Sequence, residues 1–255
     1  MLTLLNAAKP YLNRFKGIRI STRPDCIDEK ILVLLKKYKV TTIELGAQSM
    51  CDDVLISNRR GHTAADVKNA SALIKDYRFD LGLQMMTGLY KSNEEKDLYT
   101  ASEFIKLNPA CVRIYPTVVM KNTELADLYL KGEFKPFSLE KSVNLCSKIM
   151  MKFYDNDIDV IRVGLHYSDS LKENDLAGNY HPAFKELCEN KIFFDKILNS
   201  INNDNKNDII VYVNSKSLSK AVGQNRSNLI KLRAAGINVK FKTDNSLKKY
   251  EIRID

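Results

Sequence analysis

The chain has 255 residues, of which 44% are apolar, and 40 Lys and Arg against 31 Asp and Glu give a formal net charge of +9. This is an ordinary globular composition, long enough for one large domain or for a large and a small one with a real core. No apolar run reaches the roughly 18 residues of a membrane span, and the start, MLTLLNAAKP, lacks the features of a secretory signal, so we expect a cytoplasmic protein with no membrane contact. Five widely spaced cysteines indicate neither a disulfide framework nor a thiolate metal site.

Strand-like and helix-like segments alternate from the N-terminus onward. The first expected strand runs into RISTRPD, where Ile18 and Ile20 alternate with Arg19 and Pro24 stops the ladder. Further along come expected helices over 27–38, 64–77, 94–107 and 138–154 and expected strands over 41–45, 79–85, 111–119 and 158–165. This alternation is typical of parallel strands with crossover helices, in an open sheet or a barrel, and both architectures bind ligands at the carboxyl ends of the strands.

Polar or glycine-bearing clusters follow four successive expected strands. They are RISTRPD, IELGAQS with Glu44 and Gln48, LQMMTGLY with Gln84 and Gly88, and RIYPT with Arg113, Tyr115 and Thr117. Each alone has a structural explanation, such as a tight turn at Gly46 or Gly88, or a helix capped by Arg23. Because loops on a rigid scaffold carry function, the repetition at four strand ends indicates one binding site.

These clusters also carry a resemblance to a known family. The blocks ISTRPD, IELGAQS, RRGHT, QMMTGL and RIYPTVVMKNTEL with YLKGEFKPFSLEKSV resemble, over roughly residues 17–145, the radical S-adenosylmethionine (radical SAM) core of the Elongator catalytic subunit. IRVGLHYSDSL and AGNYHPAFKELCEN are similar to the continuation in its smaller bacterial relatives, which lack an acetyltransferase domain. A more distant likeness is to oxygen-independent coproporphyrinogen oxidase.

The resemblance implies a partial parallel (β/α) barrel, with its C-terminal extension, over residues 1–199. In this family the barrel binds S-adenosylmethionine across its strand ends beside a [4Fe-4S] cluster, and reductive cleavage gives a deoxyadenosyl radical. By motif, Gln48 would reach the amino-acid or ribose part of the ligand, Arg60 its carboxylate and Gln84 a ribose hydroxyl, while Ser21 stands at a position of polar ligand contact.

Structural alternatives stay open for these residues. Arg60 in RRGHT can be a solvated loop arginine, and Gln48 a buried amide that supports the strand. We expect His62 to order the loop that bears Arg60. Three histidines, no two close in sequence, offer no zinc ligand pair, and no nucleophile stands beside a base, so a hydrolase is not supported.

The departure from the family concerns the cluster. Relatives carry, upstream of this region, three closely spaced cysteines and a glycine-rich strand end, and this sequence begins after both. An iron–sulfur cluster needs thiolate ligands, so we expect that the chain alone does not assemble it and that its edge strand seeks a partner. Three explanations stay open: a separately encoded or frameshifted N-terminal half, a start position that omits the front, or a standalone domain with a new role.

The last part of the chain is electrostatically separate. Residues 205–255 hold 11 Lys and Arg and 4 Asp and Glu, so +7 of the +9 lies there. The polar stretch SINNDNKND predicts a linker over 200–208, followed by a basic α+β domain over 209–255. Its expected elements are a strand over 209–213, a helix over 217–222 begun by a serine cap, the turn GQNR, a helix over 227–234 and strands over 238–241 and 248–254.

This order, with a glycine-led turn between two helices, resembles the KH fold that clamps single-stranded RNA. Gly223 fits the first position of the turn, Arg226 stands where a second glycine is usual, and Lys216 and Lys220 complete the expected RNA-binding residues. The alternative is a small basic domain that packs on the barrel. The concentrated charge favours RNA binding.

Two functional hypotheses follow. The first is a radical SAM enzyme, here lacking its front, that in complete form modifies a base in tRNA or other RNA. The second is a non-catalytic RNA-binding relict, and a porphyrinogen-oxidase-like radical SAM enzyme is a further alternative. The sequence assigns no catalytic residue and no metal ligand within this chain.

Overall fold

The protein is described by a computed structural model that covers residues 1–166, 173–178, 180–201 and 208–255. Contacts divide it into two units, one of Met1–Ser138 with Lys152–Tyr180 and the other of Leu139–Met151 with His181–Asp255. This division differs from the boundary expected at residue 199, because helix α9 (Phe184–Ile201) packs on α10, α11 and β10. Most of the expected linker lies outside the described residues, as does part of IRVGLHYSDSL, so the linker stays a prediction.

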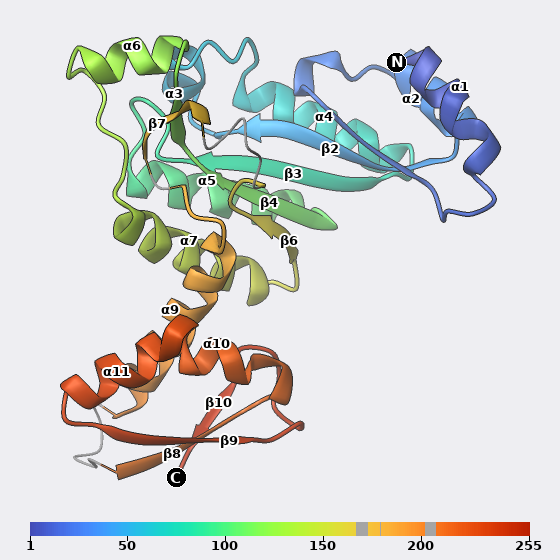
Figure 1. Ribbon diagram of the computed structural model, residues 1–255. Coiled ribbons are helices and arrows are strands. Elements are labelled where there is room, and N and C mark those ends of the chain that lie inside the picture. The colour runs from blue at the N-terminus through green and yellow to red at the C-terminus, as the bar shows by residue number, and fades with distance from the viewer. Residues whose placement is uncertain (167–172, 179, 202–207) are drawn as a thin grey trace. The chain divides into compact units, whose positions relative to one another are not determined.

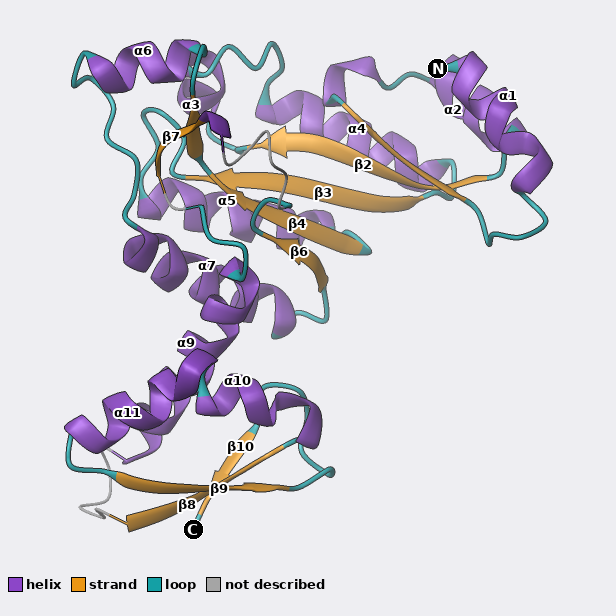
Figure 2. Ribbon diagram, viewed as in Figure 1, coloured by secondary structure: helices purple, strands orange, loops and turns teal. Residues whose placement is uncertain are grey.

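The first unit is built on a five-stranded parallel sheet with the order β1-β2-β3-β4-β6 (Figures 1 and 2). Its strands are β1 (Ile18–Thr22), β2 (Val40–Gln48), β3 (Asp80–Thr87), β4 (Cys111–Pro116) and β6 (Asp159–Val163). Parallel neighbours that follow one another in sequence require crossover connections between them. The expected α/β fold with a parallel sheet is confirmed.

Helices α2 (Glu29–Lys37), α4 (Ala64–Asp76) and α5 (Glu94–Leu107) pack against this sheet, and α4 and α5 run along one face of it (Figure 1). Each begins at a side-chain cap, since Asp28, Thr63 and Asn93 accept a hydrogen bond from a backbone N–H in the first turn. Other described helices that lie wholly within the first unit are α1 (Leu2–Ala8), α3 (Asp52–Ser57) and α6 (Glu124–Leu130), with short 3-10 turns η1 (Lys9–Tyr11) and η2 (Pro24–Cys26).

Side chains alternate between the two faces of the sheet, as strand geometry requires. The face under the helices is apolar and buried, with Ile43, Leu45, Leu81, Leu83, Met85, Val112 and Ile114. The alternate positions are largely polar: Arg19, Ser21, Glu44, Gln84, Arg113 and Tyr115. We call this second set the polar face, and it positions the site described below.

The prediction of a single strand over 111–119 is wrong, because the structure has two strands there. Strand β4 ends at Pro116, whose nitrogen has no hydrogen to donate to a ladder, and the backbone N–H of Thr117 donates to Thr87 O at 2.9 Å. The chain then forms β5 (Val118–Met120), which pairs antiparallel with β7 (Asp175–Gly178) in a separate small sheet.

The second unit carries a three-stranded sheet with the order β10-β8-β9. Its elements are the first part of α7 (Leu139–Tyr154), α9, β8 (Asp208–Val213), η3 (Ser215–Ser217), α10 (Leu218–Val222), η4 (Gln224–Arg226), α11 (Ser227–Ala234), β9 (Asn238–Thr243) and β10 (Ile252–Ile254). Strands β8 and β9 are parallel, and β10 is antiparallel to β8. The expected order of strand, two helices and strand is confirmed.

Two details of the second unit differ from the expectation. The Ser217 hydroxyl does not cap α10 but donates to the carbonyl oxygen of Lys249 at 2.7 Å. The last strand is shorter than expected, because the backbone N–H of Glu251 donates to Lys248 O and closes a turn there. Over the described residues of both units, no helix combines the length and apolar character that crossing a membrane would take.

Candidate functional site

The centre of the polar face is the carboxylate of Glu44, which is 3% exposed. Its Oε1 lies 2.5 Å from Nη1 of Arg19 and 3.1 Å from Nη2 of Arg113, and its Oε2 lies 3.4 Å from the Ser21 hydroxyl. A buried carboxylate is tolerated when ion pairs and hydrogen bonds replace its water. Glu44, on β2, therefore fixes side chains from β1 and β4 on one face of the sheet.

Both arginines of this network are held in the charged form. A hydrogen bond with Tyr115 and the charge of Glu44 raise the pKa of Arg113, and the hydrogen bond with Glu44 raises the pKa of Arg19. Nη1 of Arg113 lies 3.4 Å from the Tyr115 hydroxyl. The polar face thus presents two permanent cations and one buried anion.

Two of the predicted ligand-binding residues are brought together at the ends of neighbouring strands. Nε2 of Gln84 on β3 donates to Oε1 of Gln48 at the end of β2, at 3.2 Å. Gln48 is 4% exposed and has a φ of 65°, so the strand turns sharply there. A Cβ at Gly46 would lie 2.8 Å from Nε2 of Gln48, so this glycine provides space for the amide.

The loop that bears Arg60 is attached to the same strand end. The buried ring of His62 lies with its Nε2 3.0 Å from the carbonyl oxygen of Ala47, the residue before Gln48. The role expected for His62, to order this loop, is confirmed by that contact.

Arg60 itself is half-buried, and its Nε atom is enclosed without a hydrogen-bond partner in the described structure. Burial, followed by the nearby charge of Arg23, lowers the pKa of Arg60. Arg23 donates to the carbonyl oxygen of Gly61 at 3.3 Å and pairs with Asp25. A guanidinium with an unused, partly buried N–H is suited to a planar anion such as a carboxylate.

Ser21, the fourth expected contact, is exposed and donates to Glu44. It therefore lies with the arginine network and not with the glutamine pair. The network itself was not expected from the sequence, which grouped Glu44 with Gln48 and left Arg19 without a role. A glutamate between Ile43 and Leu45 in an apolar strand was the available signal, because a charge buried there needs a partner.

The described residues fit the two implied cofactor groups differently. Among the described side chains, no three Cys, His, Asp or Glu are arranged to hold a metal ion, and none of the five cysteines forms a disulfide, with Cys111, Cys146 and Cys188 buried. This part of the chain does not fit a [4Fe-4S] cluster. The Gln48–Gln84 pair and Arg60 fit a ligand that has hydroxyl groups and a carboxylate.

In the second unit, the turn between α10 and α11 has an unusual backbone. Gly223 has a φ of 86° and a ψ of 152°, and Asn225 and Arg226 follow with φ values of 53° and 61°. Arg226, the last residue of this turn, thus adopts the left-handed conformation that favours glycine. Such conformations concentrate at binding sites.

The expected RNA-binding lysines differ in their surroundings. Lys216 is exposed, whereas Nζ of Lys220 lies 3.2 Å from Oε2 of the buried Glu189. Glu189 also accepts a hydrogen bond from the Tyr250 hydroxyl at 2.9 Å. Lys220 is therefore partly engaged within the unit, while Arg226 and Lys216 remain exposed.

Comparisons with known proteins bear on the family. A Radical SAM superfamily model matches residues 2–102, and a Radical_SAM C-terminal domain model matches residues 109–193. The tRNA uridine(34) acetyltransferase of Methanocaldococcus infernus is 33% identical over 141 residues, 53% of this chain and 26% of that protein. Elongator complex protein 3 of Dictyostelium discoideum is 36% identical over 138 residues, 52% of this chain and 24% of that protein. The chain thus spans about a quarter of the length of these relatives.

A solved structure is similar to this chain in both fold and sequence. Elp3 of Methanocaldococcus infernus, with an N-terminal deletion (1–46), matches with a TM-score of 0.62 and 28% identity, over 71% of this chain and 42% of that one. The chain is therefore similar over residues 2–102 to the Radical SAM superfamily and over residues 109–193 to the Radical_SAM C-terminal domain, and about half of it is similar in sequence to the tRNA uridine(34) acetyltransferase and to Elongator complex protein 3.

Proposed function

We propose that this chain is part of a radical SAM protein that modifies a base in tRNA, with S-adenosylmethionine held by the first unit and RNA held by the second. One observation carries the first half of the proposal. The paired amides of Gln48 and Gln84 lie at neighbouring strand ends, and His62 ties the Arg60 loop to the same end of β2.

Arg60 is assigned to the carboxylate of S-adenosylmethionine. Its buried Nε lacks a partner, and burial together with Arg23 disfavours its charged form, so an arriving carboxylate satisfies the donor and offsets the repulsion. A carboxylate accepts two parallel hydrogen bonds from one guanidinium, and this geometry fixes the orientation of the ligand.

Gln48 and Gln84 are assigned to the ribose hydroxyls and the amino-acid part of the ligand. An amide offers both donors and an acceptor, and the Gln48–Gln84 hydrogen bond fixes which atoms point outward. Ser21 is retained as a proposed polar contact that comes from the arginine network, where its hydroxyl donates to Glu44.

When bound beside a [4Fe-4S] cluster, S-adenosylmethionine supplies a deoxyadenosyl radical that removes hydrogen from a substrate. The described residues of this chain contribute binding and orientation of the ligand. The proposed cluster ligands lie outside the described residues of this chain, and a separately encoded N-terminal half is one proposed source of them.

RNA is proposed as the partner of the second unit because of charge. The +7 of residues 205–255 is concentrated in one small unit, and the left-handed turn of Gly223–Arg226 exposes an arginine. Phosphate contacts dominate affinity for nucleic acid, and they come from such cations and from backbone N–H groups. The names of the homologous proteins indicate tRNA as the class of RNA.

The ligand assignment is tested by isothermal titration of the full chain with S-adenosylmethionine and with 5′-methylthioadenosine, which lacks the carboxylate. Arg60→Gln should weaken S-adenosylmethionine binding about 10-fold or more, as for a lost charge-assisted contact, and leave methylthioadenosine binding nearly unchanged. Arg59→Gln is the matched control, because Arg59 is exposed and pairs with Glu124. An equal loss for both ligands contradicts the assignment of Arg60, and no binding of either ligand contradicts the site.

A further inference from the structure

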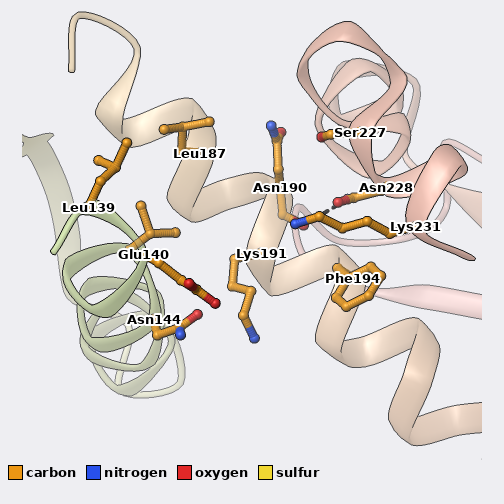
Figure 3. Close-up of a pocket in the computed structure, with 11 residues that line it drawn as sticks. Leu139, Glu140, Asn144, Leu187, Asn190, Lys191, Phe194, Ser227, Asn228 and Lys231 are labelled. Carbon is orange, nitrogen blue, oxygen red and sulfur yellow. Dashed lines mark hydrogen bonds between the residues drawn. The ribbon is translucent and has the colours of Figure 1, made fainter.

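The second unit contains a pocket of about 350 Å³ between the first part of α7, α9 and α11 (Figure 3). Leu139, Leu187 and Phe194 supply apolar walls, and Asn144, Lys191 and Lys231 supply polar groups. This volume and this mixture of walls are typical of sites for small planar ligands or single groups of a larger one.

The aromatic ring of Phe194 is the feature that narrows the ligand class. Phe194 is half-buried, and Nζ of Lys231 lies 5.7 Å from the centre of its ring (Figure 3). A partly open ring beside a lysine is the combination on which unpaired bases stack while a cation meets the phosphate. A base that stacks on the Phe194 ring displaces the ammonium group of Lys231, and this group can then contact a phosphate of the RNA backbone.

The pocket is also joined to the turn. Asn228 and Asn190, 3% and 4% exposed, both line the pocket. Asn228 donates to the backbone carbonyl oxygens of Asn190 at 2.8 Å and Ala221 at 3.1 Å, and the Asn190 side chain, with its amide turned to satisfy both atoms, accepts from the backbone N–H of Gln224 at 2.9 Å. The same two side chains therefore fix the turn and form one wall of the pocket.

Charge favours RNA as the occupant. Ser227 lines the pocket and directly follows the exposed Arg226 in the chain, so the cation of the turn is one residue away from the pocket lining. At the pocket itself, Lys191 pairs with Asp195 and the acidic Glu140 is also part of the lining, so Lys231 is the cation that the lining offers to a phosphate. A polyanion of single-stranded character matches both the positive charge and the stacking ring.

We propose that this pocket binds one unpaired nucleobase of a single-stranded RNA segment whose phosphates lie along the Gly223–Arg226 turn. The inference rests on the RNA binding proposed above for the second unit, and it adds the place where a base is held. Phe194 stacks on the base, Lys231 meets a phosphate, and Asn144 offers its amide to the edge of the base.

The test measures binding of the full chain to a fluorescent oligouridine of about 12 nucleotides, a length within the site sizes of single-strand binders. Phe194→Leu should weaken binding about 5-fold or more, since stacking is lost while apolar volume is largely kept. Phe194→Tyr, which keeps an aromatic ring, should bind about as well as the wild-type chain. Tyr99→Leu, at an exposed aromatic residue of the first unit, is the matched control and should have no effect.

Salt dependence separates stacking from charge. Phe194→Leu should leave the slope of log affinity against log salt unchanged, whereas Lys231→Gln should reduce it by about 1, one phosphate contact. With 4-thiouridine in the oligonucleotide, photocrosslinks should map to the first part of α7, to α9 or to α11.

The outcomes distinguish the two proposals. Salt-dependent binding that Phe194→Leu leaves intact, or crosslinks that avoid the first part of α7, α9 and α11, overturns the base pocket and leaves RNA binding by the second unit in place. No binding of the wild-type chain at low salt overturns both. Equal loss of binding in Phe194→Leu and Phe194→Tyr also counts against stacking, because the tyrosine keeps an aromatic ring and the loss then reflects damage to the fold.

Discussion

Gly82 on β3 makes room for the side chain of Glu44 on β2. The two residues are cross-strand neighbours, and a Cβ at Gly82 would lie 2.6 Å from Cγ of Glu44. Without that atom, the carboxylate reaches across β3 to Arg113 on β4, where Nε and Oε2 are 2.9 Å apart. A glycine within a strand commonly marks such a close approach.

Replacement of Gly82 by alanine should therefore displace Glu44. We expect Gly82→Ala to lower the free energy of unfolding by about 1–3 kcal/mol, the usual cost of overpacking, as measured by urea unfolding. A double-mutant cycle with Glu44→Ala identifies the cause: the two changes should couple by roughly 1 kcal/mol, because the clash disappears with the glutamate side chain. Additive effects would show that Gly82 is needed for another reason.

The decrease in the free energy of unfolding at acid pH should depend in part on Glu103. Hydrogen bonds from Lys106 and then from Lys68 lower the pKa of this carboxyl, with Nζ–O distances of 2.5 and 2.9 Å. Its folded pKa lies below its unfolded value, so its contribution is present above the unfolded pKa of about 4.3 and is lost as pH falls through the folded value.

Glu103→Gln should thus cost a few tenths to about 1 kcal/mol at pH 7, since both lysines are largely exposed, and almost nothing near pH 2. Urea unfolding across this pH range measures the difference. In a Lys106→Gln background the pH-dependent part should shrink. A cost that stays constant with pH would refute an ionic origin.

RNA binding should depend more on Arg226 than on other cations of the second unit. Arg226→Glu in the full chain should weaken binding of a single-stranded oligonucleotide by roughly 1 kcal/mol or more, because it reverses a charge at the proposed phosphate contact. Lys248→Glu, at another exposed lysine of the same unit, makes the same change in net charge and should matter less. Fluorescence anisotropy at several salt concentrations provides the measurement, and equal effects would indicate diffuse attraction only.

Gly223 and Gly236 form a natural pair for testing the turn. Both have positive φ, 86° and 80°, but a Cβ at Gly223 would lie 2.5 Å from Oγ of Ser227 and 2.7 Å from the backbone nitrogen of Asn228, whereas a Cβ at Gly236 meets nothing within 4 Å. Gly236→Ala should cost about 1–2 kcal/mol from backbone strain alone, and Gly223→Ala distinctly more.

Hydrogen exchange of peptides from residues 208–255 reports this difference within the second unit. Gly223→Ala should also reduce RNA binding, while Gly236→Ala should leave it near the wild-type level. Similar protection in the two variants would mean that the turn can move to accept a side chain.

Local sequence signals were sufficient for most elements of the sheet and its helices. Asp28, Thr63 and Asn93 mark the starts of α2, α4 and α5, and the spacing of apolar residues extends each helix to within a residue or two of its observed end. Such caps and periods act over a few residues, so they can be read directly from the chain. Pro116 was the local signal that should have divided the strand expected over 111–119.

The sequence by itself determined that this is an α/β chain with polar strand ends, a strongly basic last part and a likeness to radical SAM proteins. Only the tertiary structure decided that Gln48 meets Gln84, that Glu44 reaches Arg113 past Gly82, and that α9 joins the basic unit, where its Asn190 holds the turn. These contacts join residues from 36 to 69 positions apart in the sheet. Their partners are set by strand register and by the space left at a glycine, and neither quantity is written in the local pattern of any one segment.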